Sequence, residues 1–419
     1  TSLPTIAPHG FKTRVVGSAD STADDYYVEF SAFNESFGSG HWRETVAPNV
    51  EYEIDASTMP HAVIRQADGV FRFTPLDGSS YVVTPTGGTK PKKYYVPKWS
   101  DRIAGDLDSN PDPTFVGKSI KDIFLFKNRL GLLADENIIL SETSEFFNFF
   151  RKTVLSVLDT SPIDVASTHS TVSLLTSAIP FAKQLVLFSD NTQFVLGSSQ
   201  ASFTPSTVTM TKTTSYDSIS DSRPIALGDS VYFAFSRGDY VGLRQYRITT
   251  DTDSIFKAED VSVQVPQYIR GSVRNLTGSS HEDVLFLSST VDKNSLFCYK
   301  FFDQPGGGRV QSAWSKFVFE EADEILGANF IGTNLYIVTK RDDAVYLDKM
   351  SLESGLVDSG MNYRTLLDRR LTHSDIVAFT NNGLTLELPY KVYENSSSEM
   401  LVEIVDLDGR IIPSTATND

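Results

Sequence analysis

The chain has 419 residues, of which 40% are hydrophobic and 21% charged, so it is long enough for a large core and too apolar for a disordered protein. Its formal net charge of −16 argues against tight binding to a nucleic-acid backbone, although DNA is able to pass such a surface without sticking. The single cysteine excludes an internal disulfide, and no apolar run approaches the roughly 20 residues of a membrane-spanning helix.

The N-terminal residues 1–104 are predicted to form a separate β-rich module. Strand-like pieces such as DYYVEF, HWRETV, AVIRQ and VFRF are separated by the turn-forming stretches FGSG, ADG and LDGSS. Trp42 here and Trp314 further along lie among alternating strand residues, so we expect both rings to be at least partly buried. The opening stretch TSLPTIAPHGFK lacks the apolar core of a signal peptide, and a first residue other than methionine is typical of a processed or partial chain.

The segment TPTGGTKPKKYYVPKWS, residues 84–100, is basic and rich in proline and glycine, which predicts an exposed loop. Its positive charges are interleaved with the aromatic residues Tyr94, Tyr95 and Trp99. The lysines of this cluster are Lys90, Lys92, Lys93 and Lys98. Such a cluster contacts either a protein partner or DNA phosphates, and its shortness and acidic surroundings favour a protein partner.

The stretch GDLDSNPDPTFVG places Asp106, Asp108 and Asn110 at alternate positions, as a calcium-binding EF-hand loop begins. The rest of such a loop is missing, because Pro111 stands where a glycine is required and Gly117 where a bidentate glutamate is required. We therefore predict an irregular turn in which Asp and Asn side chains bond nearby backbone, with no calcium bound.

Residues 105–350 are predicted to form β-propeller blades. Short apolar runs recur between polar turns, as in QLVLF, SDNT and QFVLG, and similar hairpins follow at separations of 55, 46, 53 and 51 residues. A four-stranded blade repeats every 40 to 50 residues or so, whereas a β-sandwich offers no reason for a period of this length. The first apolar residues of these hairpins are Leu130, Leu185, Val231, Val284 and Leu335.

Residues 351–419 contain further strand patterns. NNGLTLELPYKV and MLVEIVDLDGRII combine apolar alternation with Asn-Gly and Asp-Gly turns. These strands are expected either to close the propeller or to return to the N-terminal module.

Residues able to carry catalysis or bind a metal are sparse. The histidines are scattered without a zinc-ligand spacing, and His61 in TMPHAVIR is expected to serve a turn or packing role. Cys298 in SLFCYKFF is expected to be a small buried hydrophobe rather than a nucleophile. PGGGR, residues 305–309, lacks the helix and lysine of a phosphate-binding loop, and no G-x-S-x-G elbow occurs. The sequence therefore predicts no catalytic, cofactor-binding or metal-binding residues.

Paired carboxylates are the hardest catalytic class to exclude, since a glycosidase needs only two acids from separate loops. The candidates in FEEADEILG are Glu320, Glu321, Asp323 and Glu324, and a solvated acidic loop is the commoner state of such a run. The alternative function is therefore a propeller-borne carbohydrate-binding or glycoside-cleaving protein.

Several long phrases occur in one order along nearly the whole chain. They are GSADSTADDYYVEF, HWRETV, TMPHAVIR, GDLDSNPDPTFVG, FLFKNRLGLLADENIILSETSEFFNFF, PIDVA, QLVLFSDNTQFVL and AEDVSVQVPQYI. In this order they resemble the tail tubular protein B, or nozzle protein, family of short-tailed, podovirus-type bacteriophages. TMPHAVIR and KNRLGLL followed by ENIILS are long, unusual strings, so the resemblance is specific. Proteins of that family carry further sequence before FKTRVVG and after the final strands, which would hold parts of the platform and the nozzle tip.

The resemblance implies a structural virion protein of the phage tail, with no enzymatic activity and no cofactor. It implies a β-propeller and a platform-type module in each subunit, and a homohexameric ring around a DNA channel that retains and then releases the genome. The implied partners are the adaptor ring of tail tubular protein A, the tail fibres, and genomic DNA that passes without sequence-specific binding. Lys90, Lys92, Lys93 and Lys98 are then the candidate contact loop toward a neighbouring tail protein.

Overall fold

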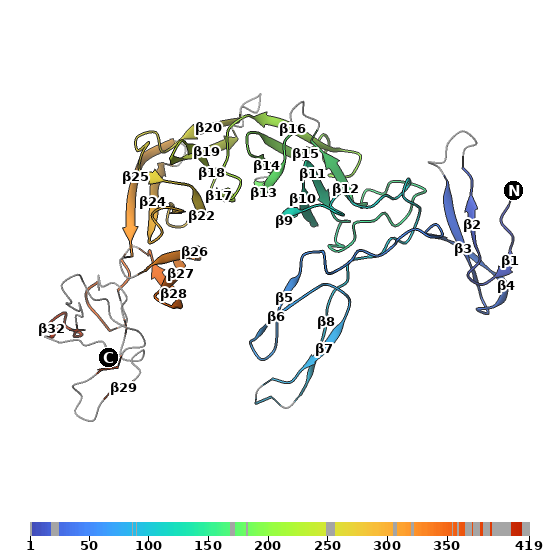
Figure 1. Ribbon diagram of the computed structural model, residues 1–419, viewed down its shortest axis with the longest axis horizontal. Coiled ribbons are helices and arrows are strands. Elements are labelled where there is room, and N and C mark those ends of the chain that lie inside the picture. The colour runs from blue at the N-terminus through green and yellow to red at the C-terminus, as the bar shows by residue number, and fades with distance from the viewer. Residues whose placement is uncertain are drawn as a thin grey trace. The chain divides into compact units, whose positions relative to one another are not determined.

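The computed structural model describes most of the chain, and the regular elements in the described part are β-strands. The described residues are 2–17, 25–85, 87–88, 90–167, 172–181, 183–248, 256–304, 308–319, 322–353, 355–357, 360–364, 371, 378–379, 386–387 and 404–412. Within these ranges there is no helix long and apolar enough to cross a membrane. Internal contacts divide the chain into two compact units, Thr1–Ser272 and Val273–Asp419, and Figure 1 labels their strands where there is room.

The first unit begins with a four-stranded antiparallel sheet in the order β1-β4-β3-β2. Its strands are β1 (Ile6–Pro8), β2 (Lys12–Val15), β3 (Tyr26–Ala32) and β4 (Phe37–Thr45). Phe30 is fully buried in this sheet, and the ring of Trp42 packs edge-on against it with centroids 5.0 Å apart. The indole N–H of Trp42 donates to the carbonyl oxygen of Pro4 at 2.8 Å. Trp42 is half-buried, which confirms the expectation from the strand pattern.

Two hairpins follow in the first unit (Figure 1). Their strands are β5 (Ala62–Arg65) with β6 (Phe71–Thr74), and β7 (Ser80–Val83) with β8 (Lys92–Tyr95). The segment 84–100 was expected to be an exposed loop throughout, and this expectation is wrong for residues 92–95, which pair with β7. Antiparallel pairing with β7 supplies residues 92–95 with backbone hydrogen bonds that a loop would leave to water.

Five antiparallel sheets then follow one another along the chain, each an up-and-down meander. Sheet 1 consists of β9 (Ile120–Phe126), β10 (Arg129–Ala134), β11 (Asn137–Leu140) and β12 (Ile163–Ala166), and sheet 2 of β13 (Leu175–Phe181), β14 (Gln184–Ser189), β15 (Gln193–Ser198) and β16 (Val208–Thr214). Sheet 3 consists of β17 (Ile225–Leu227), β18 (Ser230–Arg237), β19 (Tyr240–Ile248) and β20 (Phe256–Asp260), with β21 (Ile269–Arg270) also paired to β19. In the second unit, sheet 4 consists of β22 (Val273–Ser279), β23 (Val284–Ser289), β24 (Ser295–Gln304) and β25 (Gly308–Val318), and sheet 5 of β26 (Glu324–Ile331), β27 (Asn334–Arg341) and β28 (Ala344–Ser351).

The repeat that the sequence predicts coincides with these sheets. The marker residues are Leu130 on β10, Leu185 on β14, Val231 on β18, Val284 on β23 and Leu335 on β27. Each marker therefore lies on the second strand of a different sheet. The predicted repeat of blade-sized units is confirmed.

Within the first unit, sheets 1, 2 and 3 pack face to face in succession, so sheet 2 is buried on both surfaces. On β14, Leu185 and Leu187 lie in the core shared with sheet 1, whereas Val186 and Phe188 lie in the core shared with sheet 3. Successive side chains of a strand point to opposite faces, so the unbroken apolar run LVLF, residues 185–188, fits a strand that is covered on both sides. This stacking of meanders confirms an all-β fold with propeller-type sheets.

Sheets 4 and 5 share an equivalent core in the second unit. Cys298 is buried in it beside Phe286 and Leu335, and burial raises the pKa of the thiol. The expectation of a small buried hydrophobe is therefore confirmed for Cys298. Trp314 on β25 is half-buried against Tyr299, with ring centroids 4.9 Å apart, as the strand pattern predicts.

A glycine faces an aromatic ring across paired strands in sheet 3. Gly242 on β19 pairs with Phe235 on β18, and a Cβ added at Gly242 would lie 2.2 Å from the Phe235 ring. We expect Gly242→Ala to lower the free energy of unfolding by about 1–3 kcal/mol, because the buried ring must shift. Gly197→Ala on β15, where an added Cβ meets nothing within 4 Å, is the matched control for urea denaturation. Equal stability of the two variants would contradict this reading of Gly242.

The chain beyond residue 351 contributes short paired strands among its described residues. β29 (Ala378–Phe379) pairs with β30 (Leu386–Glu387), and β31 (Ile404–Val405) pairs with β32 (Ile411–Ile412). The Asp406 carboxylate accepts hydrogen bonds from the N–H groups of Asp408 and Arg410 at 2.9 and 2.8 Å, so the predicted Asp-Gly turn is present.

Candidate interaction surface

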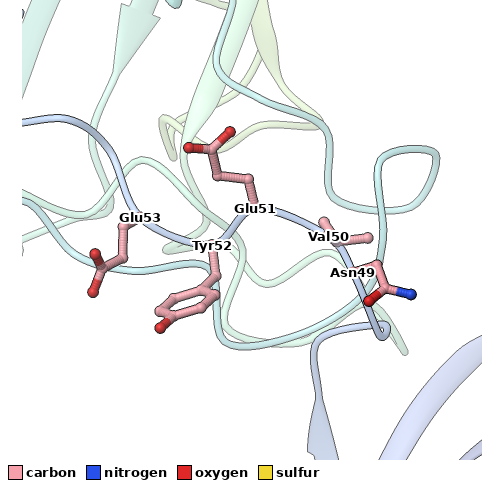
Figure 2. Close-up of a pocket in the computed structure, with 5 residues that line it drawn as sticks. All are labelled: Asn49, Val50, Glu51, Tyr52 and Glu53. Atoms are coloured by element: carbon pink, nitrogen blue, oxygen red, sulfur yellow. The ribbon is translucent and has the colours of Figure 1, made fainter.

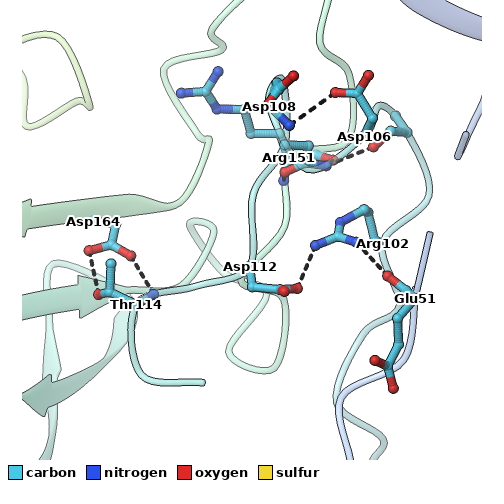
Figure 3. A network of polar contacts seen from close by, with 10 residues as sticks. Glu51, Arg102, Asp106, Asp108, Asp112, Thr114, Arg151 and Asp164 are labelled. Atoms are coloured by element: carbon cyan, nitrogen blue, oxygen red, sulfur yellow. Dashed lines mark hydrogen bonds and ion pairs between the residues drawn. The ribbon is translucent and has the colours of Figure 1, made fainter. Parts of the chain in front are cut away.

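The stretch after β8 forms an irregular junction that ties β4 to sheet 1. The Asp106 carboxylate accepts hydrogen bonds from the N–H groups of Asp108 and Ser109, at 3.1 and 2.9 Å, and from the Ser109 hydroxyl at 2.8 Å (Figure 3). Gly105 pairs with Val46 just beyond β4. The structure confirms that Asp106 shapes a turn, as its side chain commonly does by bonding nearby backbone.

Buried polar side chains complete this junction. The Asn110 side-chain amide donates to the carbonyl oxygens of Ala104 and Arg151 at 2.9 and 3.0 Å, and its oxygen accepts from the Arg151 N–H at 3.0 Å. The buried Arg102 donates to the Glu51 carbonyl oxygen and, at 2.5 Å, to the Asp112 carboxylate (Figure 3). Sequence reasoning does not single out Arg102, because an isolated arginine in DRIAG carries no pattern that indicates burial.

The Asp106 turn is expected to lose its stabilising effect in acid. Burial acts to raise the pKa of Asp106, but the hydrogen bonds from Ser109 and Asp108 outweigh it and hold the pKa below its usual value. A carboxyl with a lowered folded pKa contributes stability above its unfolded pKa and loses it as pH falls through the folded value. We expect Asp106→Ala to cost about 1 kcal/mol near pH 7 and progressively less below about pH 4, as measured by urea denaturation. Asp108→Ala, which removes an exposed carboxylate, is the control.

Two stretches were weighed as possible sites in the sequence, the acidic run FEEADEILG and the glycine-rich PGGGR, and each contains a residue that pairs with an oppositely charged side chain. Glu324 accepts a hydrogen bond from Arg274, which lowers the pKa of the Glu324 carboxyl. Glu320 and Glu321 lie outside the described residues, as do residues 305–307 of PGGGR. The guanidinium of Arg309, the last residue of that stretch, donates to the Asp303 carboxylate at 2.7 Å. The side chains of Glu324 and Arg309 are therefore both engaged in ion pairs within the chain.

His61 serves the packing role that the sequence predicts. Its Nδ1 lies 2.9 Å from the Met59 carbonyl oxygen, and its ring stacks on Phe73 with centroids 5.0 Å apart. In the described part of the chain, no group of three or more His, Cys, Asp or Glu side chains is placed to hold a metal ion. That the 105–117 turn binds no calcium stays a prediction.

One pocket lies on the extended segment before the hairpins. Figure 2 shows its lining residues, which are Asn49, Val50, Glu51, Tyr52 and Glu53. The carboxylates of Glu51 and Glu53 extend in different directions, and Glu53 pairs with Lys98 at 3.2 Å. Two acids that do not converge give no basis for glycosidase chemistry at this pocket.

The lysines of the predicted contact loop separate into two groups. Lys98 is held by carboxylates, since its Nζ lies 3.2 Å from Glu53 and 3.0 Å from Asp101. Trp99, beside it, is 1% exposed and packs in the core that the hairpins share with sheet 1. Lys98 therefore anchors the base of the β7–β8 hairpin.

The remaining lysines project from the β7–β8 hairpin. Lys90, Lys92 and Lys93 are exposed. The Nζ atoms of Lys92 and Lys93 lie 5.2 and 4.8 Å from the ring centroids of Tyr94 and Tyr95. Cation–π contacts of this kind hold the charges beside the aromatic rings and leave them facing solvent. The candidate interaction surface is thus the β7–β8 hairpin, without Lys98 and Trp99.

Two comparisons with known proteins cover all or nearly all of the chain. The family model for the bacteriophage nozzle protein matches residues 1–419. The chain belongs to the bacteriophage nozzle protein family. Tail tubular protein gp12 of Escherichia phage T7 is 33% identical over 416 residues, covering 98% of this chain and 49% of the relative. The nozzle-family chain thus spans about half the length of that relative.

Similarities to solved structures are weak. The β-propeller domain of Myceliophteria thermophila Cps50 (Swd1) has a TM-score of 0.36 with 11% identity, covering 71% of this chain and 84% of that one. Kluyveromyces lactis Hsv2 has a TM-score of 0.34 with 10% identity, covering 63% and 66%. Similarities this weak do not establish a shared function.

Family membership establishes the broad role of the chain. It is a structural protein of a bacteriophage tail and a component of the virion, as the sequence resemblance implies. The expectation of a structural protein rather than an enzyme is confirmed by this membership.

Proposed function

We propose that this nozzle-family chain is one subunit of a homohexameric ring that forms the distal DNA channel of a short phage tail. In this role the ring retains the genome in the filled virion and releases it during ejection. The observation that carries the proposal is the match of the nozzle family model to every residue of the chain. The adaptor ring of tail tubular protein A, the tail fibres and the passing genome are the proposed partners.

The proposed domain organisation follows the order of the strands. Residues 1–104 correspond to a platform-type module, 105–350 to the propeller blades, and 351–419 to strands that close the propeller or return to the platform. Strands β1–β8 fall in the first range and sheets 1–5 lie almost entirely in the second, which supports this division. The base of the first module also packs on sheet 1, where Met59 and Trp99 share a core with Leu132.

Electron microscopy of the purified chain, with its mass measured by light scattering, tests the ring. The expected result is a six-fold ring with a continuous central bore. A chain that stays monomeric at every concentration, or an assembly with no bore, would contradict the proposal. Imaging with the adaptor protein added then tests whether the ring stacks on that partner.

Weak binding to duplex DNA is expected of such a conduit. Every copy carries a net charge of −16, whereas a clamp held by counterion release needs many Lys and Arg facing the phosphates. We expect binding weaker than about 1 μM at physiological salt, with log affinity depending only weakly on log salt concentration. Fluorescence anisotropy with a labelled duplex measures both quantities. Nanomolar affinity with a steep salt slope would contradict the conduit and indicate a basic surface that grips DNA.

A further inference from the structure

The β5–β6 hairpin presents an apolar face to solvent. Val63, Phe71 and Phe73 are 62%, 63% and 71% exposed, and Val63 lies directly opposite Phe73 in the register of the two strands. Arg65 pairs with Phe71 on the same face and is exposed as well. Two exposed phenylalanines and a valine side by side form an apolar patch, and contiguous patches of this kind mark interaction sites.

The β7–β8 hairpin adds a similar outward face. Val82 and Tyr95 are 60% and 73% exposed, and Lys93 lies opposite Val82 in the strand register. The ammonium group of Lys93 stays beside the Tyr95 ring. This face therefore combines apolar area with positive charge.

Packing between the hairpins fixes these faces outward. The Arg72 guanidinium lies 4.0 Å from the centroid of the Tyr81 ring, and Tyr81 stacks on Tyr94 with centroids 5.4 Å apart. Ile64 and Tyr81 also pack against the buried core that contains Trp99. Because alternate strand residues are held inward, Val63, Phe71, Phe73, Val82 and Tyr95 have no inward-facing alternative. We call residues 62–95 the hairpin module.

The net charge of the hairpin module indicates which kind of partner covers its exposed face. The hairpin module contains five Lys or Arg and two Asp, a net charge of +3, so the rest of the chain carries −19. Exposed aspartates stand at the turn between the second and third strands in three of the sheets, and they are Asp190, Asp239, Asp342 and Asp343. A basic, apolar face on an otherwise acidic chain is complementary to another copy of the same chain.

We propose that the hairpin module docks on the acidic, blade-bearing part of a second copy of this chain. The inference rests on the proposed ring and names the surface through which its subunits meet. The exposed phenylalanines supply the buried apolar centre of this contact, and Lys93, which shares the outward face with Val82 and Tyr95, supplies positive charge at its rim. The aspartates of the blade turns are the first candidates for the acceptor.

Photo-crosslinking between copies of the chain in the assembly tests this docking. Benzoylphenylalanine replaces Phe73 in one variant, and the exposed Phe302 on β24 in the control. Mixing unlabelled and ¹⁵N-labelled copies lets mass spectrometry separate crosslinks between copies from those within one copy. We expect crosslinks from position 73 of one copy to residues 105–350 of another, with far fewer from position 302.

Assembly of substituted chains gives a second readout. We expect Phe71→Ser with Phe73→Ser, and separately Lys93→Glu, to raise the concentration at which half the chains assemble by about tenfold or more. The three side chains are exposed and Phe73 gives up only its stacking on His61, so the monomers should melt close to the wild type. Phe302→Ser is the matched control.

The outcomes separate this inference from the proposed function. A ring that forms normally in both substituted chains, with no crosslinks between copies from position 73, would overturn the docking and leave the ring intact. A wild-type chain that never assembles would overturn the ring and the docking together. Crosslinking of position 73 to added duplex DNA, or binding of the module to anionic lipid vesicles in place of a second copy, would assign the surface to another partner.

Discussion

Replacing Arg129 with alanine is expected to lower the free energy of unfolding by about 3–5 kcal/mol. The Arg129 side chain is 1% exposed and donates to the carbonyl oxygens of Ser141, Ser161 and Asp159, at 2.6, 2.7 and 3.1 Å. It therefore holds the segment between β11 and β12 against the start of β10. Alanine leaves these acceptors without their donor in a site too enclosed for water to replace it easily.

The guanidinium of Arg129 is a buried charged group, so replacing it with other side chains separates the effect of charge from that of hydrogen-bonding geometry. Burial lowers the pKa of its guanidinium, and the negative charge of Glu142 acts in the opposite direction. We expect Arg129→Lys to recover only part of the loss, because an ammonium group lacks the planar fork that reaches several acceptors at once. Lys121→Ala, at an exposed position of β9, is expected to stay within about 0.5 kcal/mol of the wild type. Guanidinium denaturation measures all three, and a loss below about 1 kcal/mol for Arg129→Ala would contradict the structural role.

Phe286→Ala is expected to destabilise the second unit by about 3–5 kcal/mol. Phe286 on β23 is 1% exposed and lies in the core between sheets 4 and 5. Its ring centroid is 5.3 Å from that of Phe317 and 6.0 Å from that of Phe330. Truncation removes these contacts and leaves a cavity between two sheets that cannot close without shifting their backbones.

Differential scanning calorimetry separates this effect from that of Arg129. Arg129 belongs to the unit Thr1–Ser272 and Phe286 to the unit Val273–Asp419. If the units unfold in separate transitions, each substitution should shift a different one. Phe286→Leu should cost clearly less than Phe286→Ala, since it keeps most of the buried volume. Phe302→Ala, at an exposed position of β24, is the control, and an equal loss for Phe302→Ala and Phe286→Ala would show that burial between the sheets is not the cause.

The blades were predictable because their signal is local and repeated. The run LVLF, residues 185–188, is apolar at every position, which fits a strand covered on both faces, and β14 shares one core with sheet 1 and another with sheet 3. The turn at Asp106 was also predictable, since an Asp side chain bonds backbone within a few residues of itself. Family membership was accessible for a similar reason, because long strings in a fixed order do not depend on how the chain folds.

The contact lysines show what only the tertiary structure decided. In the sequence, Lys92, Lys93 and Lys98 form one basic cluster with Trp99. The fold buries Trp99 against sheet 1 and pairs Lys98 with Glu53, 45 residues earlier, whereas Lys92 and Lys93 stay on an exposed strand. Strand alternation determines which side chains share a face of a strand. Which of the two faces becomes buried depends on segments that are distant in the sequence and pack against it. The burial of Arg129 was hidden for the same reason, since two of its acceptors lie 30 and 32 residues away in the sequence.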